Sequence, residues 1–185
     1  MPKTTTLISI ENVVATAGVN QPIDLKEITR LFPDVKYNPK VFPGLAFRLK
    51  APKTCTLIFR TGKMVCTGAK SEGEAFKAVQ TVVEKLRKSG IKIENEPEMK
   101  VQNIVASVSL GGRVKLEEAA LKLPRSLYEP EQFPGLIHRM LEPKTVFLVF
   151  ASGKLVCTGA KKEEEVYQAV SVLHTLLEDE GLMVY

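Results

Sequence analysis

Apolar and polar residues follow two different periods along this chain, and the same succession of periods occurs twice. Residues 7–19 are rich in β-branched side chains, which is typical of a strand. Between about 71 and 88, apolar residues recur at every third or fourth position, which predicts an amphipathic helix with one buried face. A second helix of this kind is predicted at about 162–179. The chain is therefore expected to combine β-sheet with covering helices.

Shorter elements are predicted between the first strand and the first long helix. A short helix is expected over 25–32, because the Asp24 side chain can cap its start and Pro33 ends it. Four short strands are expected at about 35–37, 45–49, 54–59 and 64–67. Hairpin-length turns join the last three of them, so the sheet is expected to be antiparallel.

The ends of the predicted helices also follow from local sequence. Ser71 and Glu74 form an S-x-x-E capping box at the start of the first long helix. Gly90 and Gly181 follow the two long helices, in the position where glycine commonly ends a helix. Lys115 occupies the cap position of the second short helix. We therefore expect four helices, of which one lacks a good capping side chain.

The chain contains one sequence unit twice. The six residues Val-Cys-Thr-Gly-Ala-Lys occur at 65–70 and again at 156–161, and the offset of 91 residues from Cys66 to Cys157 holds for the other matches without a gap. Over the length of the unit, roughly 40 per cent of the paired positions are identical. The predicted domain organisation is a first repeat at 1–93, a linker at 94–98 and a second repeat at 99–185.

One face of the predicted sheet is left without a cover. Each long helix has a single apolar stripe, so it can cover only one side of its sheet. The opposite side is also apolar or uncharged: Val146 and Leu148 share one side of their strand, while Phe147 and Val149 share the other. The second face is therefore ordinary core, or it is covered by another sheet, a partner chain or a ligand.

The residue types on that face favour a nucleic acid. Asparagine, threonine, valine and leucine form an uncharged centre, and six cations lie at its edges: Arg48, Lys63, Lys70, Arg139, Lys154 and Lys161. The cations can neutralise phosphates, while asparagine and threonine can hydrogen-bond the few acceptors of an A·T-rich minor groove. Valine and leucine can exclude the amino group of guanine. The net charge of +5 agrees with an anionic partner without identifying one.

Four phenylalanines stand at equivalent points of the two repeats. Phe42 and Phe133 each precede Pro-Gly, and Phe59 and Phe150 each end a predicted strand. A buried core is the usual place of a phenylalanine. Beside a surface that binds the minor groove, however, an aromatic side chain can enter a base step and kink the duplex. The sequence pattern is compatible with both roles.

The composition argues against several other classes of protein. With 44% hydrophobic and 25% charged residues among 185, the chain is expected to be globular, and no apolar run reaches the roughly 18 residues of a membrane span. No signal peptide is recognised. Three cysteines without a CxxC motif argue against a disulfide framework, and Cys66 and Cys157 are expected to be small core residues. Two histidines in unrelated settings make a metal site improbable.

Several segments together carry a specific family resemblance. The chain resembles the TATA-binding proteins, which recognise core promoters in archaea and eukaryotes, and the lack of a long N-terminal extension is closer to the archaeal type. The segments that carry the resemblance are 12–16, 102–107, 128–136 and both copies of Val-Cys-Thr-Gly-Ala-Lys. The resemblance implies an α+β fold of two tandem, pseudo-twofold-related repeats that form a saddle. In this fold a curved ten-stranded antiparallel sheet carries four helices on its convex face.

The resemblance also implies a role for the residues of the open face. Phe42 and Phe59 would intercalate at one end of the DNA site, and Phe133 and Phe150 at the other. The bases and the groove floor would be contacted by Asn12, Val14, Thr16, Leu57, Val65, Thr67, Asn103, Val105, Leu148, Val156 and Thr158. The six cations at the edges match positions that contact phosphates.

Function and partners follow from the same resemblance. It implies a general transcription initiation factor that binds the TATA box in the minor groove, kinks the DNA and recruits transcription factor B and RNA polymerase. Glu129, Glu131 and Gln132 match the loop on which transcription factor B docks. No cofactor, metal, membrane or small-molecule substrate is expected, and the expected location is cytoplasmic, at the nucleoid.

Two other classes of function compete with this one. An enzyme such as a nuclease needs clustered carboxylates or an activated nucleophile, and the open face has neither. His138 is expected to have a packing or surface role, and His174 lies within the second long helix and has no evident partner. A protein-interaction or RNA-binding module could use the same sheet, but A-form RNA resists wedge kinking. The protein is therefore expected not to be an enzyme.

Overall fold

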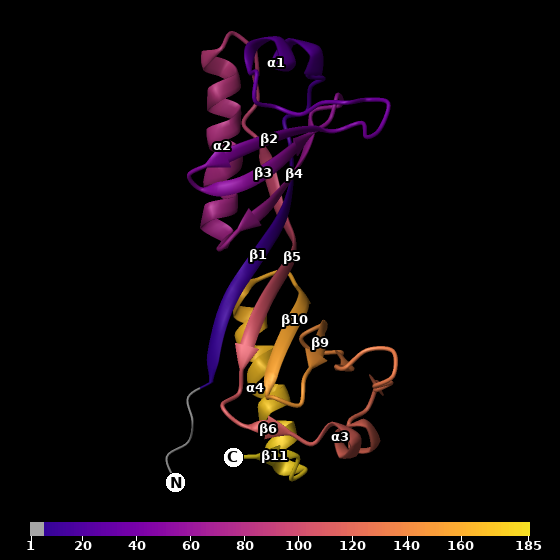
Figure 1. Cartoon of the computed structure of the whole chain (residues 1–185). Coiled ribbons are helices and arrows are strands. Elements are labelled where there is room, and N and C mark those ends of the chain that lie inside the picture. The colour runs from indigo at the N-terminus through magenta and orange to yellow at the C-terminus, as the bar shows by residue number, and fades with distance from the viewer. Residues whose placement is uncertain (1–5) are drawn as a thin grey trace. The chain divides into compact units, whose positions relative to one another are not determined.

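The structure is a computed structural model that describes residues 6–185 (Figure 1). Its helices are α1 (Leu25–Leu31), α2 (Glu72–Lys88), α3 (Leu116–Lys122) and α4 (Glu163–Asp179). Its strands are β1 (Leu7–Gly18), β2 (Leu45–Lys50), β3 (Lys53–Ile58), β4 (Lys63–Ala69), β5 (Glu98–Ser109), β6 (Arg113–Val114), β7 (Ser126–Leu127), β8 (Leu136–Met140), β9 (Thr145–Val149), β10 (Lys154–Ala160) and β11 (Met183–Val184). The predicted α+β class, with four helices and a large antiparallel sheet, is confirmed.

The large sheet has nine strands, in the order β2-β3-β4-β1-β5-β10-β9-β8-β7, and β6 and β11 form a second, two-stranded sheet. The resemblance implied ten strands. The strand predicted at 35–37 is reduced to a bridge in which Lys36 and Ala46 exchange backbone hydrogen bonds of 3.2 and 2.8 Å. The chain turns away directly afterwards, because Pro39 has no N–H with which to continue a ladder.

The chain forms two compact units that share the long strands β1 and β5. We call residues 12–102 the N-terminal unit, and residues 103–185 with the described chain up to Glu11 the C-terminal unit. The end of β1 and the start of β5 therefore belong to the N-terminal unit, while the other two halves belong to the C-terminal unit. The repeat boundaries at 93 and 99 describe the sequence and stay a prediction.

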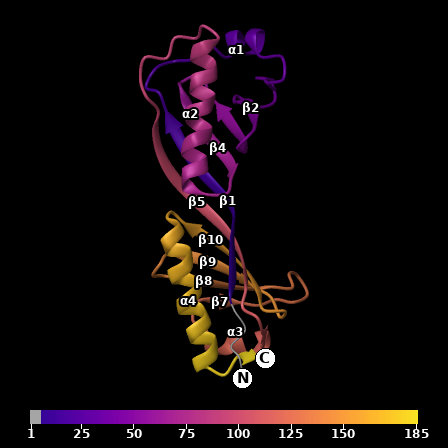
Figure 2. The same cartoon turned by 90° about the vertical axis from the view of Figure 1, so that its left-hand side faces the viewer.

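Each long helix packs on one face of the strands in its own unit (Figure 2). The apolar stripe of α2 is buried, and it consists of Ala75, Val79, Val82, Val83 and Leu86. The same holds for the stripe of α4: Val166, Ala169, Val170, Leu173 and Leu177. Cys66 and Cys157 lie in these cores and are fully buried, as expected for small core residues. Within residues 6–185, no helix combines the length and the apolar character that crossing a bilayer requires.

The helix caps largely follow the sequence prediction. Asp24 Oδ1 accepts hydrogen bonds from the backbone N–H groups of Lys26 (3.0 Å) and Glu27 (3.3 Å) at the start of α1. Ser71 Oγ accepts from the backbone N–H of Glu74 at 3.0 Å, so this half of the capping box is formed at α2. Lys115 makes no side-chain cap bond at α3. The second short helix, α3, therefore lacks the side-chain cap hydrogen bonds that α1 has.

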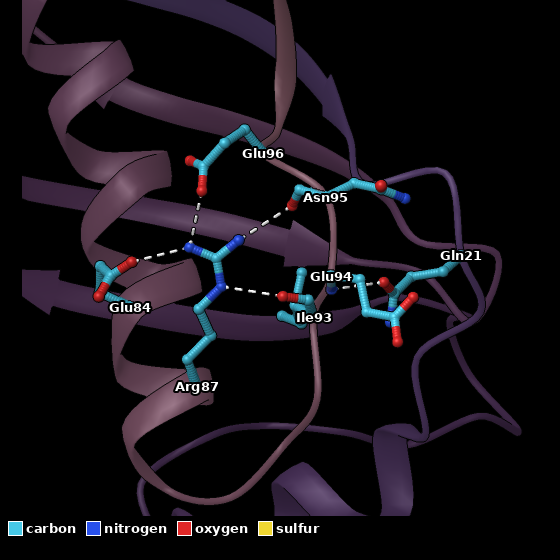
Figure 3. Close-up of polar contacts among 7 residues, drawn as sticks. All are labelled: Gln21, Glu84, Arg87, Ile93, Glu94, Asn95 and Glu96. Carbon is cyan, nitrogen blue, oxygen red and sulfur yellow. Dashed lines mark hydrogen bonds and ion pairs between the residues drawn. The ribbon is translucent and has the colours of Figure 1, made fainter.

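The segment that connects α2 to β5 is held from two sides by side chains of the N-terminal unit (Figure 3). Arg87 donates to the backbone carbonyls of Ile93 (3.1 Å) and Asn95 (3.0 Å). From the other side, Gln21 accepts from the backbone N–H of Glu94 at 2.9 Å. Arg87 also forms ion pairs with two carboxylates, those of Glu84 and Glu96. The predicted linker is thus a hydrogen-bonded connection that leads directly into β5.

Replacing Asp24 by alanine should lower the free energy of unfolding by about 1 kcal/mol, because two backbone N–H groups lose their acceptor. Lys115→Ala is the matched control, since Lys115 has the same position in α3 but makes no cap bond. Chemical denaturation of both variants and the parent protein measures the difference. An equal loss for both variants would show that the side-chain cap is not the cause.

Candidate nucleic-acid interface

In the N-terminal unit, the sheet face opposite α2 carries uncharged, half-buried side chains. Strand register aligns them in two rows across β1, β2, β3 and β4. The first row contains Thr16, Val65, Leu57 and Ala46. The second row contains Thr67, Cys55 and Arg48, of which Arg48 is exposed and the other two are half-buried. We call this surface the open face of the unit. Because its side chains are only half-buried, it is not ordinary core.

The C-terminal unit has an open face of the same construction, opposite α4. Its first row contains Ser107, Val156, Leu148 and Ile137. Its second row contains Thr158, Val146 and Arg139. The register brings together several side chains that the sequence prediction did not assign to the site: Ala46, Cys55, Ser107, Ile137 and Val146. Alternation along a strand already places Cys55 with Leu57 and Val146 with Leu148 on one side, while the register shows which of these side chains are neighbours across the sheet.

One asparagine in each unit is held by a backbone bond across an irregularity in the sheet. Asn12 Oδ1 accepts from the N–H of Gly68, and Asn103 Oδ1 accepts from the N–H of Gly159, each at 2.7 Å. The pairing register shifts at these points, and both glycines have positive φ, +94° and +97°. A backbone N–H can only donate, so each amide oxygen faces the glycine. The –NH₂ group of Asn12 therefore points away from the glycine, whereas that of Asn103 donates one of its two N–H bonds to Thr158 Oγ1 at 3.2 Å.

Two phenylalanine pairs lie at the ends of the strands. Phe42 and Phe59 are in edge-to-face contact with ring centroids 5.9 Å apart, and Phe133 and Phe150 repeat this arrangement at 5.9 Å. Phe42 is 45% exposed and Phe133 is 38% exposed. These two rings are therefore not core residues. Each pair presents apolar surface beside an open face.

A glycine lies beneath each phenylalanine pair. A Cβ atom at Gly44 would lie 2.7 Å from the Phe42 ring and 3.0 Å from that of Phe59. At Gly135 the same atom would lie 2.8 Å from the ring of Phe133. The Phe-Pro-Gly segment therefore needs glycine so that the first ring can fold onto the second. The sequence prediction treated Pro-Gly only as a marker of the repeat.

All six predicted phosphate-binding cations are exposed: Arg48, Lys63, Lys70, Arg139, Lys154 and Lys161. Arg48 and Arg139 lie at the outer ends of the second rows, paired with Cys55 and Val146. Lys63 stands two positions before Val65 in β4, and residues two positions apart in a strand lie on the same side of it. The open faces thus combine uncharged centres with cations at their margins.

The two histidines lie away from the open faces. His138 is buried, its Nδ1 lies 3.2 Å from the hydroxyl of Ser126, and its burial lowers its pKa. The expectation that His174 has no partner is wrong, since its ring lies within hydrogen-bond distance of Thr6 and Tyr185. Among residues 6–185, no group of three or more His, Cys, Asp or Glu side chains could hold a metal ion.

The three residues predicted to bind a protein partner lie in one exposed turn. Glu129, Glu131 and Gln132 are all exposed. The backbone N–H groups of Gln132 and Phe133 donate to the carbonyl of Glu129 at 2.9 and 3.0 Å. The turn is therefore a defined loop that leads directly into the exposed ring of Phe133.

The cysteines should differ sharply in reactivity. Burial raises the pKa of Cys157 to about 12 and also raises the pKa of Cys66, whereas Cys55 is half-buried on the open face. A raised pKa leaves less thiolate at pH 8, and the thiolate is the reactive form. A thiol reagent at pH 8 should therefore modify Cys55 alone in the folded protein, as mass spectrometry can measure.

Unfolding in denaturant should then make all three cysteines reactive, and the variant Cys55→Ser should show no rapid modification when folded. Modification of Cys157 in the folded protein at the rate of Cys55 would contradict the buried placement.

Comparisons with known proteins agree with this geometry. The family described as transcription factor TFIID (or TATA-binding protein, TBP) matches residues 7–89 and 98–179. A TATA-box-binding protein of Pyrodictium occultum is 55% identical over 169 residues, which are 91% of this chain and 85% of that protein. One of Sulfolobus acidocaldarius is 52% identical over 164 residues, covering 89% and 83%. The solved structure of Methanococcus jannaschii TBP matches with a TM-score of 0.85 and 43% identity, over 93% of this chain and 98% of that one.

Proposed function

This chain belongs to the TATA-binding protein family of transcription factors, and from that premise we propose that it binds the TATA box through the minor groove and kinks the DNA with its phenylalanines. Membership makes it a DNA-binding transcription initiation factor and not an enzyme. The mode of binding is our proposal. The observation that supports it best is the uncharged, half-buried open face that each unit presents opposite its long helix.

The hydrogen-bonding groups of the open faces suit an A·T-rich minor groove. Such a groove offers only acceptors, adenine N3 and thymine O2, whereas a G·C pair adds the donor of the guanine amino group. The –NH₂ groups of Asn12 and Asn103 are donors, because their oxygens accept from Gly68 and Gly159. Leu57, Val65 and their counterparts supply an apolar floor that gives a guanine amino group no acceptor. The face therefore favours A·T pairs.

The phenylalanine pairs are suited to act as wedges. Inserting an apolar ring between base pairs unstacks one step and bends the duplex toward the major groove, a mode of which the TATA-binding protein family is itself a standard example. Phe42 and Phe133 are exposed and lie against a second ring, so a rigid aromatic edge is already formed. The exposed arginines and lysines at the margins would hold the phosphates of the bent DNA.

A bend-sensitive binding assay tests this proposal. Fluorescence transfer between the ends of a short duplex should report tight binding and a large bend on an A·T-rich TATA element. The same duplex with G·C steps at its centre should bind at least about tenfold more weakly, because each mismatched pair costs about 1–3 kcal/mol. An RNA duplex of the same sequence serves as the competitor for the alternative of an RNA-binding module. Equal binding of all three, without a bend, would refute the proposal.

Phe133→Ala and Phe150→Ala should reduce the bend strongly and leave the melting temperature almost unchanged, because Phe133 is exposed and Phe150 is only half-buried. Phe147→Ala is the matched control in the same strand region, since that ring is fully buried, and it should lower stability by about 3–5 kcal/mol. The bend assay and thermal unfolding measure the two effects separately. A large loss of stability with an intact bend would assign Phe133 and Phe150 to the core.

We further propose that the exposed loop of Glu129, Glu131 and Gln132 docks transcription factor B, which then recruits RNA polymerase at the nucleoid. Glu129→Lys combined with Glu131→Lys should weaken capture of transcription factor B on a TATA duplex by about tenfold or more, because like charges across an interface repel. Binding of the duplex alone should not weaken. Glu94→Lys, at an exposed glutamate of the N-terminal unit, is the control. Unchanged capture by the double variant would refute this partner assignment.

A further inference from the structure

We infer that Gln21 and Tyr185 are positioning residues for the phenylalanine wedges, because each supports the turn that carries Phe59 or Phe150. The inference rests on the proposed function and concerns one turn in each unit, at residues 59–62 and 150–153. We call the contact that supports a turn from behind its brace. Each positioning residue acts through its turn and not by contact with a base.

The second phenylalanine of each pair is fixed by the turn that it begins. The backbone N–H of Phe59 donates to the carbonyl of Lys63, and its carbonyl accepts from the N–H of Gly62, each at 2.9 Å. Phe150 makes the same two bonds in its own turn, at 3.0 Å each. Because both backbone groups of the phenylalanine belong to the turn, a shift of the turn also shifts the ring.

Another stretch of backbone lies directly behind each turn. A Cβ atom at Gly62 would lie 2.1 Å from the carbonyl oxygen of Gln21. A Cβ atom at Gly153 would lie 1.7 Å from the carbonyl oxygen of Gly112, which stands at the equivalent point of the second repeat. No side chain fits at either position, so each turn rests backbone against backbone on one residue. That residue is a stop against which the turn can press.

Hydrogen bonds on both sides of the stop tie it to the turn. In the N-terminal unit, the N–H of Val19 donates to the carbonyl of Gly62 at 3.2 Å. The N–H of Ile23 donates to the carbonyl of Arg60 at 2.9 Å. The C-terminal unit forms the two equivalent bonds at 3.0 Å each. The turn therefore moves only together with the segment that contains the stop.

In the N-terminal unit the brace is the side chain of Gln21. It donates to the carbonyl of Lys92 at 2.7 Å and accepts from the N–H of Glu94 at 2.9 Å. Arg87 of α2 holds the same connecting segment by donating to two of its backbone carbonyls (Figure 3). Gln21 is thus linked to the long helix through hydrogen bonds, and the stop behind Gly62 is held in place.

The C-terminal unit braces its stop with an aromatic ring. Gly112 has no side chain, and a Cβ atom there would lie 2.6 Å from the ring of Tyr185. The strand just before Tyr185, β11, pairs with β6. The tyrosine hydroxyl donates to Glu178 and lies 3.1 Å from Nε2 of His174, so the ring is linked to α4. The ring of Tyr185 therefore corresponds to the hydrogen bonds of Gln21 in the other unit.

A wedge depends on such a brace because the DNA resists insertion. Inserting a ring separates two stacked base pairs, and the bases restack as soon as the ring withdraws. The duplex therefore pushes on the ring, and the ring pushes on its turn. Attraction of the phosphates to the marginal cations needs no insertion. The brace should thus affect the bent complex more than the first encounter with DNA.

The first experiment measures base unstacking at the two ends of the site with the full-length protein. A palindromic A·T-rich duplex carries 2-aminopurine, which becomes more fluorescent when it unstacks, at the kinked step of each end. Gln21→Met keeps the length of the side chain but loses both hydrogen bonds, so it should remove about half of the fluorescence increase. It should also speed dissociation of the bent complex by about threefold to tenfold. An unchanged increase would contradict the inference.

The same duplex tests the brace of the C-terminal unit. Tyr185→Ala should also remove about half of the fluorescence increase, and together with Gln21→Met it should remove most of it. Tyr185→Phe keeps the ring against Gly112 and should retain most of the increase. Equal losses in Tyr185→Phe and Tyr185→Ala would show that the ring is not the brace.

A double-mutant cycle shows whether Gln21 acts through Phe59. In the variant Phe59→Ala, a further Gln21→Met should leave the fluorescence unchanged, because the brace then has no ring to support. In the variant Phe150→Ala, the same substitution should strongly reduce the remaining increase. Equal effects of Gln21→Met in both variants would overturn the inference.

Asp24→Ala is the matched control, because it also loses two hydrogen bonds of the N-terminal unit, at the cap of α1. It should lower the melting temperature about as much as Gln21→Met does and leave the fluorescence increase intact. Equal losses of fluorescence in both variants would make Gln21 merely structural and refute the inference. If the parent protein unstacks neither end, the proposed function itself fails. If it unstacks both ends and Gln21→Met changes nothing, only the inference fails.

Discussion

The structure depends on one packing constraint, which is that each long helix has a single apolar stripe. The stripes of α2 and α4 are fully buried, so each helix covers one face of its sheet and cannot reach the other. Strand residues alternate between two uncharged sides, and the side without a helix stays half-buried. The open face is therefore the side of each sheet that is left without a covering helix.

The sheet also orients the asparagine side chains of the open faces. At the irregularities around Gly68 and Gly159, a backbone N–H turns away from the ladder and would lack an acceptor without the side chains of Asn12 and Asn103. One bond thus gives an exposed backbone N–H an acceptor within the sheet and fixes which way the amide group points. The same side chain thus has a structural role in the sheet and, in the proposed mode of binding, a role in base recognition.

Repetition of one sequence unit explains why the two structural units resemble each other. An identical set of rings, amides and cations suits a ligand whose two halves are similar. The two copies also differ at the start of the short helices, where Asp24 accepts two cap hydrogen bonds and Lys115 makes none.

The sequence by itself determined the features that depend on near neighbours: the repeat, the four helices with their caps and glycine ends, the buried stripes and the expectation of an open face. The tertiary structure decided what depends on contacts between distant residues. It reduced 35–37 to a bridge, held the predicted linker through Arg87 and Gln21, and gave His174 partners from two other segments. It also set the cross-strand rows that join Ala46 to Leu57 and Cys55 to Arg48. Periodicity reports which side of a strand a residue occupies, but its neighbour across the sheet is set by register, and register exists only once the strands have paired.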